Sequence, residues 1–137
     1  MSAYLKPLPA IDARHQPHWD GARAGRLMIQ ACSDCSALRY PFSKLCPQCH
    51  STKSEWRQAS GKGAVWSWCV FHRVYFKGFA DEIPYSVVLV ELDEGVKLYS
   101  NLIGVAKDRI RIGMRVRAVF EAATDQVTLV KFEEDTA

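Results

Sequence analysis

Two C-x-x-C pairs, separated by ten residues, constrain the fold of this chain more than any other feature. They are Cys32-Ser33-Asp34-Cys35 and Cys46-Pro47-Gln48-Cys49. Each such turn directs two sulfurs toward one point and leaves backbone N–H groups to stabilise thiolate charge, so two turns supply a tetrahedral ligand set. We predict one structural zinc ion, because four thiolates leave no coordination position open. The predicted ligands are Cys32, Cys35, Cys46 and Cys49.

Other uses of these cysteines are two disulfides, four unrelated thiols, or an iron site like that of rubredoxin. Disulfides need an oxidising compartment. The segment 1–7 lacks the apolar core of a secretory signal, which predicts a cytoplasmic location. Rubredoxins usually have glycine after each C-x-x-C turn, where this chain has Ser36 and His50. This difference favours zinc over iron.

The charge of the chain is distributed unevenly. Residues 1–62 carry nine Lys/Arg and four Asp/Glu, whereas residues 63–137 carry nine and eleven. The larger C-terminal part, with a net charge of −2, therefore does not have the composition of a basic nucleic-acid platform. No apolar run approaches the roughly 18 residues that span a membrane.

The pattern of residues predicts three units: an arm and helix over 1–26, a zinc ribbon over 27–60 and a barrel over 61–137. The helix is expected between Asp12 as N-cap and Gly25 as C-terminal stop, or from Pro17. His15 and His18 are expected at the surface or at the helix cap. A hinge is expected over residues 60–63.

The predicted fold class is mainly β, with a rubredoxin-like zinc ribbon and a five-stranded OB-fold barrel. The first barrel strand is long and curved, and a connector is expected over 107–113. An acidic, solvated tail is expected over 133–135. The expected strands are 27–30, 38–40, 55–58, 64–76, 85–92, 96–103, 115–122 and 127–132.

An ordered set of motifs resembles a known family. Trp19, Gly25 and Leu27 precede the first C-x-x-C pair, and the second pair is followed by the motifs at 60–63, 84–85, 92–95, 100–104 and 112–114. The chain resembles the acyl-CoA-associated zinc-ribbon and OB-fold proteins, formerly a domain of unknown function. The resemblance implies an accessory subunit of a thiolase-like enzyme that helps to form the acyl-CoA site. It also implies a two-plus-two hetero-tetramer, while some relatives partner hydratases.

The sequence offers no catalytic machinery of its own. Thiolase chemistry requires an activated cysteine near a histidine. Cys69, the one cysteine outside the pairs, lies between Trp68 and Val70 in a predicted strand, where we expect a small apolar core residue. The reactive residues are therefore expected on a partner subunit.

An acyl-CoA ligand requires an apolar groove, a few polar groups and some Lys or Arg. One segment after the first barrel strand offers this mixture. The same residues suit a protein interface or a core equally well, since interfaces use aromatic and Arg anchors. The candidates are His72, Arg73, Tyr75, Phe76, Lys77, Phe79 and Tyr85.

Two other functions fit parts of the sequence. OB-folds and zinc ribbons bind single-stranded nucleic acid, and Trp66, Trp68 and Phe71 are candidates for a stacking platform. The negative charge of the barrel half opposes this use. A rubredoxin-like electron carrier is the second alternative, and it would be red rather than colourless.

Overall fold

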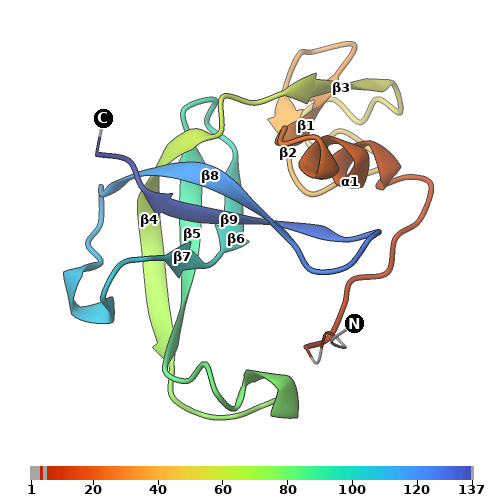
Figure 1. Cartoon of the computed structure of the whole chain (residues 1–137). Helices are drawn as coiled ribbons and strands as arrows, with labels where there is room; N and C mark the ends of the chain where they lie inside the picture. The colour runs from red at the N-terminus through yellow and green to blue at the C-terminus, as the bar shows by residue number, and fades with distance from the viewer. Residues whose placement is uncertain (1–3, 5, 137) are drawn as a thin grey trace.

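The computed structural model describes residues 4 and 6–136, which form a short helix, a small ribbon sheet and a barrel (Figure 1). Helix α1 (Gln16–Arg23) lies against a small ribbon sheet and against the barrel. Among the described residues, no helix is long and apolar enough to cross a membrane. The mainly β architecture with an N-terminal helix, a ribbon and an OB-fold confirms the predicted fold class. The strands are β1 (Met28–Cys32), β2 (Leu38–Arg39), β3 (Ser54–Gln58), β4 (Lys62–Phe71), β5 (Tyr85–Leu92), β6 (Lys97–Ser100), β7 (Leu102–Ile103), β8 (Arg115–Ala122) and β9 (Thr128–Glu134).

Helix α1 begins at Gln16, next to Pro17, in agreement with the second of the two predicted starts. Asp12 accepts hydrogen bonds from the backbone N–H groups of Arg14 and His15 and forms a turn before the helix rather than its cap. At the other end, Gly25 has φ +76°. The Gly25 N–H donates to Ala22 O and the Arg26 N–H to Gly21 O. This pairing is a Schellman motif, so glycine ends the helix as predicted.

The barrel sheet has the order β6-β5-β4-β8-β9-β7. Strands β6 and β7 lie at opposite ends of this order, yet only Asn101 separates them in the chain. β7 pairs in parallel with β9, and this short pairing closes the barrel. The predicted single strand over 96–103 is therefore wrong, because the chain changes from one partner strand to another at Asn101.

Strand β4 ends at Phe71, five residues before the predicted end at Phe76. Beyond Phe71 the chain pairs with no strand of the described residues, and residues 72–84 form a loop that contains the turn η1 (Lys77–Phe79). In Figure 1 this loop lies at the end of the molecule opposite the ribbon. The predicted bounds of β5 and β8 are confirmed. The connector before β8 contains the turn η2 (Lys107–Arg109).

One hydrophobic core joins the ribbon to the barrel. Leu27 and Ile29, on or beside β1, belong to the same buried cluster as Val90 and Phe132 of the barrel. Ala59 bridges the two parts and donates its N–H to Leu27 O at 2.8 Å. Gly63 permits the close pairing of β4 with β5, since a Cβ there would lie 2.4 Å from the Glu91 carbonyl oxygen.

The sequence suggested that the acidic residues near the C-terminus form a solvated tail. The structure instead places two of them in a strand. Glu133 and Glu134 belong to β9 and are half-buried. Glu133 forms an ion pair with Arg117 at 3.5 Å, and Glu134 one with Arg109 at 4.0 Å. Pairing with β8 extends β9 to this point, because Val116 lies opposite Glu134.

Candidate functional site

The four paired cysteines converge at the tip of the ribbon. Their Sγ atoms all lie within 4.8 Å of one another. The Cys32 and Cys49 sulfurs are 3.5 Å apart, and those of Cys35 and Cys46 are 3.6 Å apart. These separations exclude S–S bonds of about 2.05 Å. They are close to the ~3.8 Å that four Zn–S bonds of about 2.3 Å in a tetrahedron would give.

Backbone geometry prepares the cluster for a cation. The N–H groups of Asp34 and Cys35 point at the Cys32 sulfur at 3.4 and 3.5 Å, and the Gln48 N–H points at Cys46 at 3.4 Å. Hydrogen bonding from the Cys35 backbone, despite opposing burial, lowers the pKa of Cys32 to about 6. Ser36 and His50 adopt φ values of 65° and 64° after the two turns. Rubredoxins usually have glycine at these two positions, and here serine and histidine adopt the same kind of backbone conformation.

Four adjacent thiols cannot all ionise without a positive charge among them. The Ser51 backbone lowers the pKa of Cys49, but hydrogen bonds with the neighbouring sulfurs, together with burial, raise it to about 12. A divalent cation removes this conflict by neutralising the thiolates. The donor set therefore fits structural zinc.

The candidate acyl-CoA residues gather in and beside the loop of residues 72–84. Tyr85 stacks on Phe79 with ring centroids 5.0 Å apart and on Phe71 at 5.3 Å. Phe76 contacts Phe79 at 6.5 Å, and the side chain of Arg73 lies over the ring of Tyr75 at 5.5 Å. Tyr75 and Phe76 are more than half exposed. Six of the seven candidates are thus in or next to this aromatic cluster, whereas His72 is exposed and has no described contact with it.

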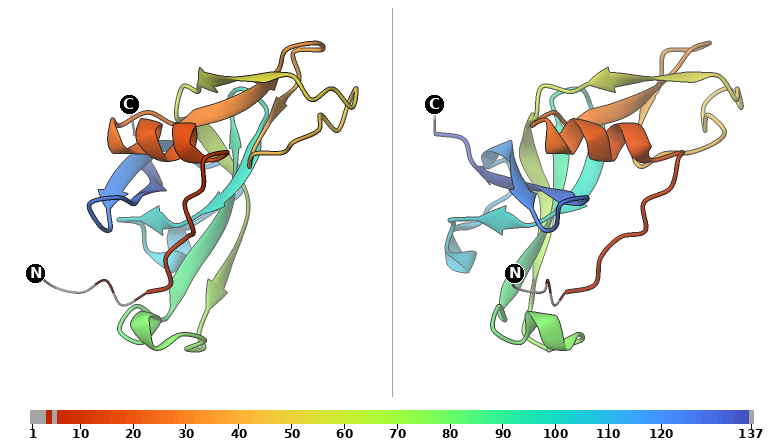
Figure 2. Two further views of the ribbon diagram at one scale, coloured as in Figure 1. Left: turned by 90° about the vertical axis from the view of Figure 1, so that its right-hand side faces the viewer. Right: turned by 45° about the vertical axis from the view of Figure 1, so that its right-hand side comes forward.

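Sequence reasoning missed the contribution of Lys6 to this cluster. Its ammonium lies 2.7 Å from the Glu82 carboxylate and 5.3 Å from the centroid of the Phe79 ring. The N-terminal arm therefore reaches from α1 to the loop of residues 72–84, as Figure 2 shows. No periodic pattern in the arm could have indicated this contact.

Cys69 is exposed, not buried as predicted. The reason is an irregularity in β4: Val65 lies opposite Val90, but Ser67 lies opposite Leu89. The extra residue, Trp66, reverses the alternation that follows, so Trp68 packs on the core and Cys69 faces outward. The predicted stacking platform is divided for the same reason, because Trp66 and Phe71 lie on the face opposite to Trp68.

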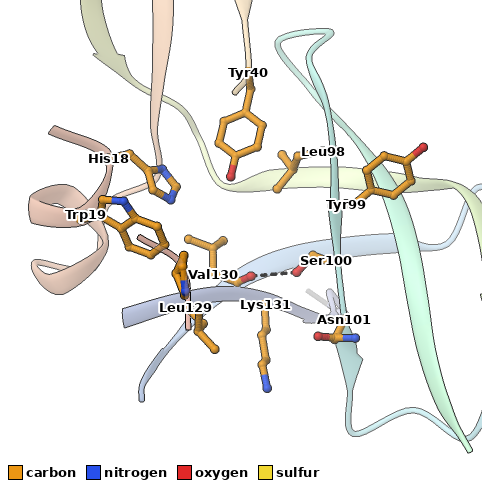
Figure 3. A pocket seen from close by; sticks show the side chains of 11 residues that line it. His18, Trp19, Tyr40, Leu98, Tyr99, Ser100, Asn101, Leu129, Val130 and Lys131 are labelled. Carbon is orange, nitrogen blue, oxygen red and sulfur yellow. Dashed lines mark hydrogen bonds between the residues drawn. The ribbon is translucent and has the colours of Figure 1, made fainter. Parts of the chain in front are cut away.

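A cavity of about 300 Å³ lies where α1, the ribbon and the barrel meet. Figure 3 shows His18 and Trp19 from α1 on one side, with Tyr40 above and Leu129 to Lys131 of β9 below. His18 is 8% exposed, which contradicts its predicted surface position. Its Nδ1 atom has no hydrogen-bond partner among the described residues.

Burial lowers the pKa of His18 below its ordinary value of 6.5, although the Met28 backbone acts in the opposite direction. The unfolded chain therefore binds this proton more readily than the folded chain. We expect the free energy of unfolding to decrease as the pH falls below about 6.5, by at most ~1.4 kcal/mol per pH unit. Urea unfolding between about pH 5.5 and 8 with zinc present measures this slope. The variant His18→Phe should reduce it, the exposed-residue variant His72→Gln should not, and an unchanged slope in His18→Phe would refute the assignment.

Two family models match adjacent parts of the chain. The rubredoxin-like zinc ribbon domain of ChsH2 matches residues 19–55, and the C-terminal OB-fold domain of ChsH2 matches residues 56–121. A DUF35 domain-containing scaffold protein of Methanothermobacter thermautotrophicus is 33% identical, with 69% of this chain and 71% of that protein covered.

Two further similarities involve proteins named as enzymes or as parts of enzymes. A probable enoyl-CoA hydratase alpha subunit of Thermomonospora curvata is 41% identical over 93% of this chain. This chain spans only 40% of that subunit. A chain in the solved structure titled Ltp2-ChsH2(DUF35) aldolase is 39% identical and superposes with a TM-score of 0.82. That match covers 93% of this chain and 98% of the other.

Proposed function

Because this chain belongs to the ChsH2 (DUF35) family of zinc-ribbon and OB-fold proteins, we propose that it is a non-catalytic accessory subunit of a thiolase-type enzyme that acts on an acyl-CoA. The observation that carries the proposal is the similarity to almost the whole of one chain in the aldolase complex. The arrangement of two accessory and two enzyme subunits, and a cytoplasmic location, remain part of the proposal.

The residues themselves support a non-catalytic role. Cys69 lies opposite Val87 on an exposed sheet face. Among the described residues, no histidine forms a hydrogen bond with it. The other four cysteines are gathered in the ribbon. An acyl-transfer nucleophile needs an adjacent base, so the reacting groups are assigned to the partner.

The ribbon cysteines are proposed as the ligands of one structural zinc ion. Zinc supplies positive charge that holds four thiolates together, and no chemistry passes through a closed site of this kind. We also propose a division of the chain into an arm and helix over 1–26, the zinc ribbon over 27–60 and the barrel over 61–137. The metal stabilises the ribbon, and the shared core transmits this stability to the barrel. The ligands are Cys32, Cys35, Cys46 and Cys49.

The loop of residues 72–84 is proposed to contact the acyl-CoA beside the partner's reacting groups. Exposed Tyr75 and Phe76 offer apolar area for an acyl chain or pantetheine arm, and Lys77 and Arg73 offer charge for phosphate. Stacking of Phe79 on Tyr85 supports the loop from below. The loop therefore combines a stacked aromatic base with an exposed outer edge.

Exchanging Phe76 for alanine together with Lys77 for glutamate should weaken acyl-CoA binding by the enzyme complex. We expect the dissociation constant to rise about tenfold, which corresponds to ~1.4 kcal/mol. Calorimetric titration of the complex with an acyl-CoA substrate measures it. The matched double variant Arg111→Glu, Ile112→Ala, in the exposed connector before β8, should bind as the native complex does. Equal affinities for both variants would remove the loop from the site.

The accessory role is tested by purification from native cells with an affinity tag on this chain. The expected result is an acyl-CoA enzyme recovered in a one-to-one ratio, whose activity decreases when the chain is removed. The chain alone should catalyse neither thiolysis, hydration nor aldol cleavage. Substantial turnover by the chain alone would overturn the proposal, as would recovery of nucleic acid with steeply salt-dependent affinity.

A further inference from the structure

The outer face of the β4–β5–β6 sheet, apart from Tyr85, has no role in the proposed acyl-CoA contact. In an antiparallel pair, residues directly opposite each other point to the same side. Val88 and Val90 of β5 are fully buried, so the alternate residues of β5 must face outward. The face lies on the side of β4 and β5 away from β8 and β9, as the left panel of Figure 2 shows.

Three cross-strand rows on this face are largely apolar. Phe71 lies opposite Tyr85, and Cys69 lies opposite Val87. Leu89 lies opposite Tyr99 of β6 on one side and Ser67 of β4 on the other. Trp66 follows at the irregularity in β4. We call this surface the outer sheet face; it comprises Trp66, Ser67, Cys69, Phe71, Tyr85, Val87, Leu89 and Tyr99.

The outer sheet face differs from an ordinary solvated sheet surface. An antiparallel sheet with one wet side normally alternates apolar residues with polar ones. Here the outward positions of β5 are Tyr85, Val87 and Leu89 before the first charge, Glu91. Trp66 is 52% exposed and Tyr99 is 74% exposed. Phe71, Tyr85, Val87 and Leu89 on the same face are half-buried, so the face is a continuous but only partly exposed apolar surface. Apolar surfaces of this kind mark interaction sites.

The charged residues around the outer sheet face indicate what kind of partner surface would fit it. Glu91 is neutralised by Lys97 at 3.7 Å, and the Lys97 ammonium also lies 4.3 Å from the centroid of the Trp66 ring. Lys62 at one end, and Arg73 and Lys77 at the other, form no ion pair among the described residues. Two carboxylates near these ends are likewise without an ion pair: Asp81 in the loop, and Glu94 in the turn beside Lys62, where it accepts hydrogen bonds from Ser60. A fitting partner surface is therefore apolar at its centre and carries carboxylates at its two ends.

We propose that the outer sheet face is the surface on which the acyl-CoA enzyme subunit docks, through an apolar patch with acidic ends. This inference rests on the proposed accessory function. A second copy of this chain fits less well, because it would bring the cations at the ends of one face toward those of the other under two-fold symmetry. Trp66 and Tyr99 supply the aromatic anchors that interfaces favour. The face is continuous with the loop of residues 72–84 through Phe71 and Tyr85, so docking would place the loop beside the partner's site.

The alkylation rate of Cys69, at the centre of the face, can report whether a partner covers it. Cys69 is exposed, and iodoacetamide should modify it readily in the free chain. In the complex recovered with the tagged chain, the rate of Cys69 alkylation, followed by peptide mass, should decrease at least tenfold. A cysteine placed outside the face by Ile112→Cys serves as the control and should react equally fast in both states. Unchanged Cys69 reactivity in an intact complex would overturn the docking assignment.

Two anchor substitutions complete the test. The double variant Trp66→Glu, Tyr99→Glu should weaken partner binding at least a hundredfold by surface plasmon resonance, since it buries two carboxylates against an apolar patch. Ile112→Glu should bind normally, and circular dichroism should show all variants folded. If a partner is recovered but binds the double variant equally well, the docking surface is wrong and the accessory function stands. If no enzyme subunit is recovered, the proposed function itself fails. Concentration-dependent protection of Cys69 in the chain alone, with doubled mass, would assign the face to a second copy instead.

Discussion

Replacing Cys46 with serine should produce a chain that neither retains zinc nor folds. Cys46 is fully buried, and its sulfur lies 3.6 Å from that of Cys35. Structural zinc contributes about 10–16 kcal/mol to the folding of zinc-finger peptides near pH 7. That range equals or exceeds the whole stability of a typical domain, which is roughly 5–15 kcal/mol. Metal analysis and thermal unfolding followed by circular dichroism measure the two consequences.

The effect should extend beyond the ribbon because of the shared core. Strand β1 carries Cys32 at one end and Ile29 near the other, and Ile29 belongs to the same buried cluster as the barrel residues. Loss of the ribbon would therefore expose one side of the barrel core. The matched control is Cys69→Ser, which removes an exposed thiol and should leave the unfolding temperature and one zinc per chain unchanged. A Cys46→Ser chain as stable as the native protein would refute a structural role for the metal.

The ribbon was predicted well from sequence because its constraints are local. A C-x-x-C turn fixes its own geometry, and the residue that follows it must accept a positive φ. The structure gives Ser36 and His50 that conformation. The bounds of β5 and β8 were also predicted, since each is a run of alternating or β-branched residues that ends at a charged turn. Such segments carry their structural signal within a few residues.

The errors arise where tertiary contacts decide the outcome. The irregularity at Trp66 depends on how β4 pairs with β5, so strict alternation placed Cys69 on the wrong side. His18 was expected at the surface because a helix pattern does not reveal that the barrel covers that face of α1. The split at Asn101 depends on β9, which lies about thirty residues further along the chain. A sequence pattern alone contains none of these pairings.

The same distinction applies to the candidate surfaces. The aromatic loop was identified from sequence because its members are close together in the chain, from His72 to Tyr85. The outer sheet face could not be identified in this way. Its rows combine Cys69 with Val87 and Leu89 with Tyr99, and these pairs exist only in the folded register. Once the irregularity in β4 is known, the apolar character of that face follows from the residues already present.

Phe132→Ala should destabilise the barrel by about 3–5 kcal/mol, the usual cost of removing a fully buried phenylalanine side chain. Phe132 is 0% exposed and lies between two strands, opposite Ala118 of β8 and Leu102 of β7. Its N–H donates to Asn101 O at 3.0 Å, at the residue where the chain passes from β6 to β7. The ring thus occupies the position at which the short parallel pairing closes the barrel.

Urea unfolding of the zinc-loaded protein measures this loss, and a matched control comes from the same chemical change at an exposed position. Phe76 is 56% exposed, so Phe76→Ala should change the free energy of unfolding by no more than about 0.5 kcal/mol. A loss below about 1 kcal/mol for Phe132→Ala would mean that the barrel does not close around this ring. A loss in the expected range, with an unchanged slope against urea, would show that the core beneath β7, a strand of only two residues, contributes to closing the barrel.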